Sequence, residues 1–265
     1  MRDPTQTTSI RQALIRRYSA EYRSLRGDIL RYMDRQKFPM TPADVRKFSK
    51  WLDARSMRVV SSIDLGEYVL KAYGNGVARA GISNVLNKNH GDKIGALYGM
   101  LKADTEAARQ AMVSQVIERM NDASIRGAGP TEVLEEVRGR INKVGLTRSI
   151  TSANTVIPFA SNVGGVEAAG QSNAKMMFQW HTRQDEKVRT SHALRNMKIY
   201  SEQVGLNLLG EPNCRCWIEP VVEIDQDKFK KVRDAGLKIS VMAQKEQRFW
   251  RTLDIDKQAR GYVGD

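Results

Sequence analysis

The sequence predicts a mainly α-helical protein: long N-terminal helices, a small C-terminal α+β module that contains an antiparallel hairpin, and a helical tail. Before residue 175, apolar residues recur at spacings of three and four, which is the period of one helical face. From Lys175 onward, a short bulky stretch is flanked by polar residues, a pattern typical of strands. We therefore expect three consecutive segments: a helical region over 1–174, the α+β module over 175–222 and a basic helical tail over 223–265.

A first long helix is expected from Thr8 or Ser9 to about Gln36. Six apolar residues at the helical period form its inner face: Leu14, Tyr18, Tyr22, Leu25, Ile29 and Met33. Four arginines fall mainly off that face: Arg16, Arg23, Arg31 and Arg35. The helix is therefore expected to bury one side and to present positive charge on the other.

Positive charge is concentrated at the N-terminal end of the chain. The net charge is +13 and the pI is near 9.8, and residues 1–60 hold 14 Lys and Arg against 6 Asp and Glu. Such a surface can simply keep the helices solvated, or it can bind DNA or an acidic protein. The asymmetry favours binding, with Arg16, Arg23, Arg31 and Arg35 as candidate DNA-binding residues. No apolar run approaches the ~20 residues that a membrane-spanning helix needs.

Two further helices are expected before residue 90. Thr41-Pro42-Ala43-Asp44 favours a helix start, because Thr caps well, Pro suits the first helical position and an acid complements the first turn. The next helix spans Leu65 to Lys88, where Gly74 and Gly76 mark close packing or a kink. Its inner side is expected to carry Leu70, Tyr73, Val77 and Ala80. Asn89-His90-Gly91 breaks the pattern, which places His90 in a surface turn.

Helices are also expected between residues 104 and 170. Asp104-Thr105 starts one that runs to about Ile125 and is stopped by Gly127-Ala128-Gly129-Pro130. Thr131 then caps a shorter helix. The expected inner residues of these two helices are Met112, Val116 and Met120, then Val133, Val137, Ile141 and Val144. In the apolar segment Arg148 to Gly170, Pro158 is expected to kink or split the helix, and Gly164-Gly165 to loosen it.

The α+β module is expected to be a small antiparallel sheet with one helix against it. Met176–His181 predicts a strand, and Asp185 to Arg195 predicts a short helix. Lys198 to Ser201 and Cys216 to Val222 predict two more strands. After Asp225 the chain returns to a basic helical pattern.

Residues able to do chemistry gather between Trp180 and Trp217. This stretch holds two of the three His, both Cys and two of the four Trp. On one helix, Asp185, Arg189 and His192 would share a face at i, i+4 and i+7. We expect an Asp185–Arg189 ion pair that fixes how this helix meets the segment around Asn213.

The segment Asp185-Glu186-Lys187-Val188-Arg189, the pair Ser191-His192 and the run Asn213-Cys214-Arg215-Cys216 resemble the phage head morphogenesis family. These are the phage Mu F-like minor head proteins of tailed bacteriophages. The resemblance covers roughly 175–220, and the preceding helices only in general character. Two departures stand out: Asn196-Met197 replaces a usual Asp-Gly turn, and Gly210-Glu211-Pro212 replaces a segment that often holds a His.

The resemblance implies a minor head protein that associates with portal or capsid proteins during assembly in the host cytoplasm and resides in the virion head. Non-specific contact with the phage DNA is also expected. The residues that carry the motif, assigned a structural role, are Trp180, Asp185, Arg189, His192, Asn213, Cys214 and Cys216. We expect no catalytic residue and no cofactor.

Two other interpretations remain open. A phage-encoded metal-dependent nuclease or effector enzyme would use Asp185, Glu186 and His192. A basic helical adaptor of the host is the third interpretation.

The two cysteines also allow two interpretations. Cys214 and Cys216, one residue apart, would share one side of an extended strand and could join His181 or His192 around zinc. Structural zinc sites usually space their cysteines by two to four residues, and the family's additional His is missing. We therefore expect no bound metal, and two reduced thiols buried under Trp180 or Trp217.

Overall fold

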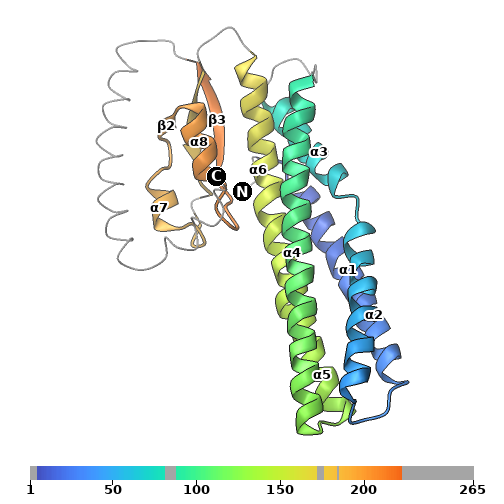
Figure 1. Cartoon of the computed structure of the whole chain (residues 1–265). Helices are drawn as coiled ribbons and strands as arrows, with labels where there is room; N and C mark the ends of the chain where they lie inside the picture. The colour runs from blue at the N-terminus through green and yellow to red at the C-terminus, as the bar shows by residue number, and fades with distance from the viewer. Residues whose placement is uncertain (1–4, 81–87, 172–175, 184, 223–265) are drawn as a thin grey trace. The chain divides into compact units, whose positions relative to one another are not determined.

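The computed structural model describes residues 5–80, 88–171, 176–183 and 185–222, and these are mainly helical with one small sheet (Figure 1). The N-terminal elements are α1 (Thr8–Met33), α2 (Pro42–Ser61), α3 (Leu65–Arg79), α4 (Lys88–Arg126), α5 (Pro130–Arg140), the π-helical segment η1 (Ile141–Leu146) and α6 (Thr147–Gly170). The C-terminal elements are β1 (Met176–His181), α7 (Thr190–Ala193), β2 (Ile199–Tyr200), α8 (Glu202–Leu209) and β3 (Trp217–Val222). The predicted fold class is confirmed, while the expected basic tail lies outside the described residues.

The chain divides into two compact units, each built from segments far apart in the sequence. The helical unit comprises Ser9–Tyr68 and Gly95–Ala153. The motif unit comprises the described residues of Met1–Thr8, Val69–Ile94 and Asn154–Asp265. The division differs from the three consecutive segments expected, because the small sheet shares its core with parts of the helical region.

In the helical unit, α1 buries the six residues that its sequence pattern indicated: Leu14, Tyr18, Tyr22, Leu25, Ile29 and Met33. The Tyr18 hydroxyl is hydrogen-bonded to Thr105 of α4 at 2.7 Å, and the Tyr22 hydroxyl to Ser149 of α6 at 3.2 Å. Buried phenols need such partners, so these two bonds fix α1 against both neighbours.

Helix α2 begins as the sequence indicated. The Thr41 hydroxyl accepts a hydrogen bond from the Asp44 N–H, and the Asp44 carboxylate accepts one from the Thr41 N–H. This reciprocal pair satisfies two backbone groups that a helix start leaves without partners.

The sequence-based boundaries of α3 and α4 were partly wrong. Helix α4 runs unbroken from Lys88 through Asn89-His90-Gly91 to Arg126, so it does not start at Asp104. Leu70 is 46% exposed, and Val69 takes the inner position on α3 instead. His90 lies in the core of the motif unit and not in a surface turn: it is hydrogen-bonded to Tyr73 at 2.5 Å and to Gln171 at 2.6 Å. Two partners for the ring explain how a polar residue is accommodated there.

The segment from α5 to α6 is continuous. Gly129, not Thr131, occupies the N-cap of α5, and η1 leads directly into α6. The expected inner residues Val133, Val137, Ile141 and Val144 are buried. Pro158 neither splits nor ends α6, because this helix is buried on almost every side and its packing outweighs the ~3 kcal/mol cost of an internal proline.

The sheet of the motif unit is antiparallel with strand order β2-β1-β3. Phe178 and Trp180 of β1 point into a core that also contains Val166 and Ala169 of α6. Helix α8, which the sequence analysis did not anticipate, packs against β1. Two helices thus contribute to the core of the motif unit: α6, which precedes the sheet in the sequence, and α8, which lies between β2 and β3.

Candidate functional site

The motif residues come from three places in the motif unit. Trp180 lies on β1, His192 on α7, and Asn213 to Cys216 on the segment that leads from α8 into β3. Strand β3 pairs with β1 so that Trp180 is opposite Ile218. This register brings the residues just before β3 to the end of β1 where the chain turns toward α7.

A buried cluster of His192, Cys214 and Cys216 forms the centre of the site. The three side chains are 2–5% exposed. The His192 Nδ1 atom lies 3.3 Å from Cys216 Sγ and 3.6 Å from Cys214 Sγ, and the three atoms are all within 4.8 Å of one another. Among the described residues, this is the one group of His, Cys, Asp or Glu side chains arranged so that it could hold a metal ion.

Glu211 links the cluster to a set of positive charges. Its Oε2 accepts hydrogen bonds from His192 Nε2 at 2.9 Å and from Arg189 Nη1 at 2.9 Å. Arg195 approaches the other carboxylate oxygen at 3.6 Å. The Arg195 guanidinium also lies over the Trp180 ring, and the Trp180 and His192 rings pack nearly perpendicular to each other. One carboxylate therefore connects the buried histidine to two arginines.

Hydrogen bonds within the cluster shift the pKa values of its ionisable groups. Hydrogen bonding from Cys216 and from His192 lowers the pKa of Cys214 to about 5 despite its burial. The pKa of Cys216 is raised by its hydrogen bond to Cys214 and by burial. Burial opposes charge on His192, but the bonds to Cys214 and Glu211 outweigh it and raise the pKa of His192. Burial likewise opposes charge on Glu211, and the contact with His192 and the two arginines lowers its pKa.

The expected Asp185–Arg189 pair is wrong. Asp185 instead forms a bidentate pair with Arg215, at 2.6 and 2.7 Å, and this contact lowers the pKa of Asp185. Arg189 bonds Glu211 and the Pro212 carbonyl. The reason is local: Asp185 to Val188 form a turn, and α7 begins only at Thr190, so Asp185 and Arg189 do not share a helical face.

Asn213 forms the tight turn that precedes the two cysteines. Its φ is +58°, a left-handed conformation that asparagine tolerates better than most residues. Its backbone N–H donates to the Thr155 hydroxyl of α6 at 2.9 Å. The tight turn thereby presents Cys214 and Cys216 from a segment anchored on α6.

Asn162 of α6 also positions the segment, and the sequence analysis missed it. Its amide accepts from the Ile218 N–H at 3.0 Å and donates to the Cys216 carbonyl at 3.3 Å. Arg79 of α3 reaches the Ile218 carbonyl as well. The available signal was an amide directly before the apolar run 163–166, since a buried Asn must form hydrogen bonds.

The residues of the nuclease interpretation are not gathered into one site. Asp185 and Glu186 are exposed, and Asp185 is held by Arg215, whereas His192 is in the core. His181, the other histidine considered as a ligand, stacks on Trp217 at 5.3 Å and lies near Glu219. It takes no part in the cluster.

The candidate DNA-binding arginines lie on or near α1 in the helical unit. Arg16, Arg23, Arg31 and Arg35 are all exposed, opposite the buried stripe or just beyond the helix end. Arg31 is paired with Asp28. The first three lie on the exposed side of one helix.

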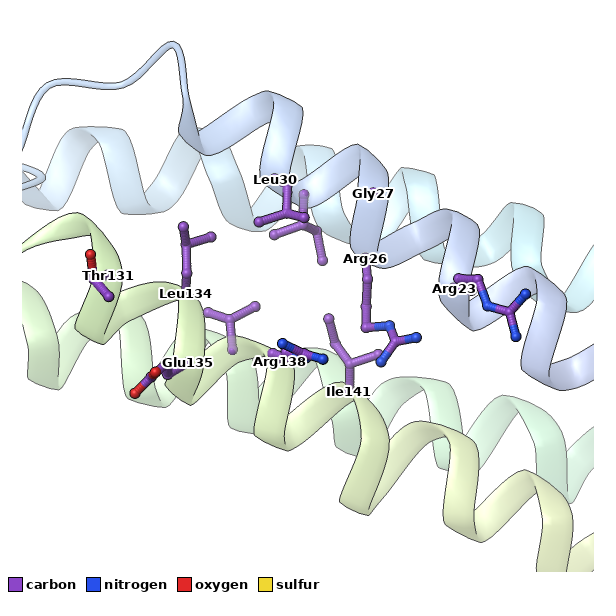
Figure 2. A pocket seen from close by; sticks show the side chains of 11 residues that line it. Arg23, Arg26, Gly27, Leu30, Thr131, Leu134, Glu135, Arg138 and Ile141 are labelled. Carbon is purple, nitrogen blue, oxygen red and sulfur yellow. The ribbon is translucent and has the colours of Figure 1, made fainter.

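A pocket of about 490 Å³ adjoins this surface, between α1 and the α5–η1 segment (Figure 2). Ile29, Leu30, Leu134, Val137 and Ile141 give it an apolar lining. Arg23, Arg26 and Arg138 add positive charge at its side, and Arg26 also donates to the Asn142 side chain. The lining thus combines apolar surface with three cationic groups and one carboxylate, that of Glu135.

No helix in the described part of the chain is both long and apolar enough to cross a membrane. In comparisons with known proteins, no family profile, curated protein or solved structure matches this chain.

Proposed function

We propose that this protein is a minor head protein of a tailed bacteriophage, which binds portal or capsid proteins during head assembly and contacts the packaged DNA. The resemblance on which this rests involves two stretches about 20 residues apart, 185–192 and 213–216. One observation carries the proposal: the fold brings residues of both stretches into contact, with His192 against Cys214 and Cys216, and Asp185 against Arg215.

The contacts within the motif support a structural role. The histidine and both thiols are nearly fully buried, and the surrounding charges pair with one another. A catalytic group must meet its substrate, whereas these side chains are turned toward protein. The motif is thus suited to holding α7 and the start of β3 together as a rigid part of an assembly protein.

The basic helical unit supports the expected partners. A face of α1 with several exposed arginines attracts phosphates or acidic protein surfaces without requiring a particular sequence. The adjoining apolar pocket adds a place where a protein segment can dock. Both features fit a protein that bridges head proteins and DNA.

Co-expression tests the proposed association. The chain is produced with the portal protein and the major capsid protein from the same phage or prophage, and complexes are isolated through a tag on the portal. We expect the chain to co-purify with portal or with capsid shells at physiological salt. The variant Arg16→Gln/Arg23→Gln/Arg31→Gln/Arg35→Gln, which removes four positive charges from the basic face, separates binding by that face from binding by the motif unit. Free chain in every pull-down, with portal and shells assembling normally, would contradict the proposal.

A further inference from the structure

We propose that His192, Cys214 and Cys216 together bind one zinc ion. The inference is independent of the proposed head function, because it concerns only what these three side chains can hold. It departs from the expectation of a metal-free thiol pair, and the reason is geometric.

Both distances from the histidine nitrogen to the sulfurs are close to those of a tetrahedral zinc site, and the two sulfurs lie within 4.8 Å of each other. With Zn–S bonds of about 2.3 Å and Zn–N bonds of about 2.0–2.1 Å, a tetrahedral ion requires N···S separations of about 3.6 Å. The His192 Nδ1 atom is 3.3 Å from one sulfur and 3.6 Å from the other. Binding an ion therefore requires only small movements of the three side chains.

The structure removes both objections that the sequence raised. Cysteines one residue apart are poor partners when a loop must wrap around the ion, but here they lie in an extended segment that presents both to the same side. The segment before Asn213 lacks a histidine, but His192 takes its place. His192 lies on α7, 22 residues before Cys214 in the sequence, and its ring is in contact with the sulfurs. Two soft thiolates with one imidazole form a ligand set that suits zinc.

The surroundings of His192 also resemble those of a metal ligand. Its Nε2 donates to the Glu211 carboxylate at 2.9 Å, which leaves the lone pair of Nδ1 facing the sulfurs. A carboxylate on the far nitrogen fixes the tautomer and the orientation of a zinc-bound histidine and strengthens it as a ligand. Arg189 and Arg195 hold that carboxylate in turn.

The bound ion would join α7 to the segment before β3. Three protein ligands leave one tetrahedral position for a water molecule or another donor, as in zinc sites with two cysteines and one histidine. Because binding requires the folded arrangement, zinc would stabilise the motif unit.

Metal analysis of the full chain tests the proposal. Protein purified under reducing conditions, reconstituted with zinc and dialysed against buffer is expected to hold about one zinc per chain. Replacement by Co²⁺ is expected to give the charge-transfer band of a thiolate ligand and the strong visible bands of a tetrahedral site. Cys214→Ser and Cys216→Ser should each lose the bound metal, whereas the control His181→Gln should keep it. Glu211→Gln should keep the stoichiometry but weaken zinc affinity about 10- to 100-fold.

Wild-type protein alone can overturn the inference, so the test does not depend on whether a variant folds. A zinc content far below one ion per chain after reconstitution would overturn the inference. Co²⁺ spectra without thiolate bands would overturn it as well. Equal zinc content in the wild type and in folded Cys214→Ser/Cys216→Ser protein would also overturn it, because the ion would then be bound elsewhere.

Discussion

Gly76 of α3 lies directly against the main chain of Ser161 in α6, closer than any side chain would permit. A Cβ atom on Gly76 would overlap the Ser161 carbonyl oxygen and lie 2.8 Å from the Gly165 nitrogen. On the opposite helix, a Cβ on Gly164 would overlap the Tyr73 carbonyl oxygen. The glycines that were expected to loosen α6 therefore allow two helices of the motif unit to pack backbone to backbone.

The close approach predicts opposite effects for two neighbouring glycines. Gly76→Ala is expected to destabilise the protein by more than about 2 kcal/mol, because the clash is with backbone that cannot rotate away. Gly74→Ala is the matched control: its Cβ would meet nothing within 4 Å, so the better helix propensity of Ala should give a gain of up to about 1 kcal/mol. Denaturant unfolding of both variants measures the difference. Similar stabilities would show that the two helices do not pack this closely.

The Asp185–Arg215 pair is tested by a double-mutant cycle. Combining Asp185→Asn with Arg215→Gln should reveal a coupling in melting temperature, since each single change breaks the bidentate contact. Combining Asp185→Asn with Arg189→Gln is the control and should be additive, because those residues do not touch. NMR titration gives a second measurement: Arg215→Gln should let the pKa of Asp185 rise toward its ordinary value. A coupling between Asp185 and Arg189 instead would show that these two residues share a helical face, as the sequence pattern indicated.

Arg109 predicts an acid-dependent loss of stability in the helical unit. Its buried guanidinium bonds Glu106 on α4 and Asp53 on α2, and the bond to Arg109 lowers the pKa of Glu106. The pKa of Glu106 is lower in the folded protein than in the unfolded chain. The ion pair therefore stabilises the fold fully above the unfolded-state pKa of about 4.3, and this stabilisation is lost as pH falls through the folded-state pKa. Both acids are partly exposed, so Arg109→Met should cost about 1–3 kcal/mol at pH 7.

Urea unfolding between pH 7 and pH 3 checks this prediction. The wild type should lose more stability than Arg109→Met over that range, so that the two curves converge in acid. Arg119→Met serves as control, since Arg119 makes only a surface contact with Asp122 at 3.7 Å and should change stability by less than about 0.5 kcal/mol. Parallel curves for the wild type and Arg109→Met would rule out the linkage.

The basic face of α1 predicts sequence-independent, salt-sensitive DNA binding. Affinity should fall by orders of magnitude between roughly 50 and 200 mM salt, because phosphate contacts release counterions. Changing Arg16, Arg23, Arg31 and Arg35 together to Gln should weaken binding equally for all sequences and flatten the salt dependence. The control removes four positive charges elsewhere in the helical unit: Lys102→Gln, Arg119→Gln, Lys143→Gln and Arg148→Gln. Fluorescence anisotropy with unrelated duplexes measures both variants.

Two results would contradict that prediction. One is an equal loss of affinity in both variants, which would mean that net charge matters and the α1 face does not. The other is degradation of plasmid in the presence of Mg²⁺ or Mn²⁺, which would favour the nuclease interpretation instead.

The elements of the helical unit could largely be predicted because they depend on local patterns. The stripe from Leu14 to Met33 and the Thr41–Asp44 capping box repeat at fixed short spacings, and the structure confirms both. Helix α4 could not be bounded this way: Asn89-His90-Gly91 is a poor local helix former, but the buried His90 gains two hydrogen-bond partners, Tyr73 of α3 and Gln171 directly after α6. Tertiary contacts there outweigh propensity.

The candidate site was predictable only as a set of residues. The sequence singled out Trp180, His192, Cys214 and Cys216, and all four lie in one buried region. The ion pairs could not be predicted from the sequence. Helix α7 begins at Thr190 and does not include Asp185, so Asp185 pairs with Arg215 and not with Arg189. The roles of Glu211 and Asn162 depend on the path of the chain between α8 and β3, which no local pattern specifies.

The most direct test of the account is to quantify this protein in purified heads. Procapsids and virions from an induced culture of the encoding phage or prophage are separated on density gradients and measured by mass spectrometry against the portal and major capsid proteins. The account predicts that the protein migrates with the heads in low, reproducible copy number, and that deleting its gene yields fewer infectious particles. Heads that contain none of it and form normally without its gene would contradict the account.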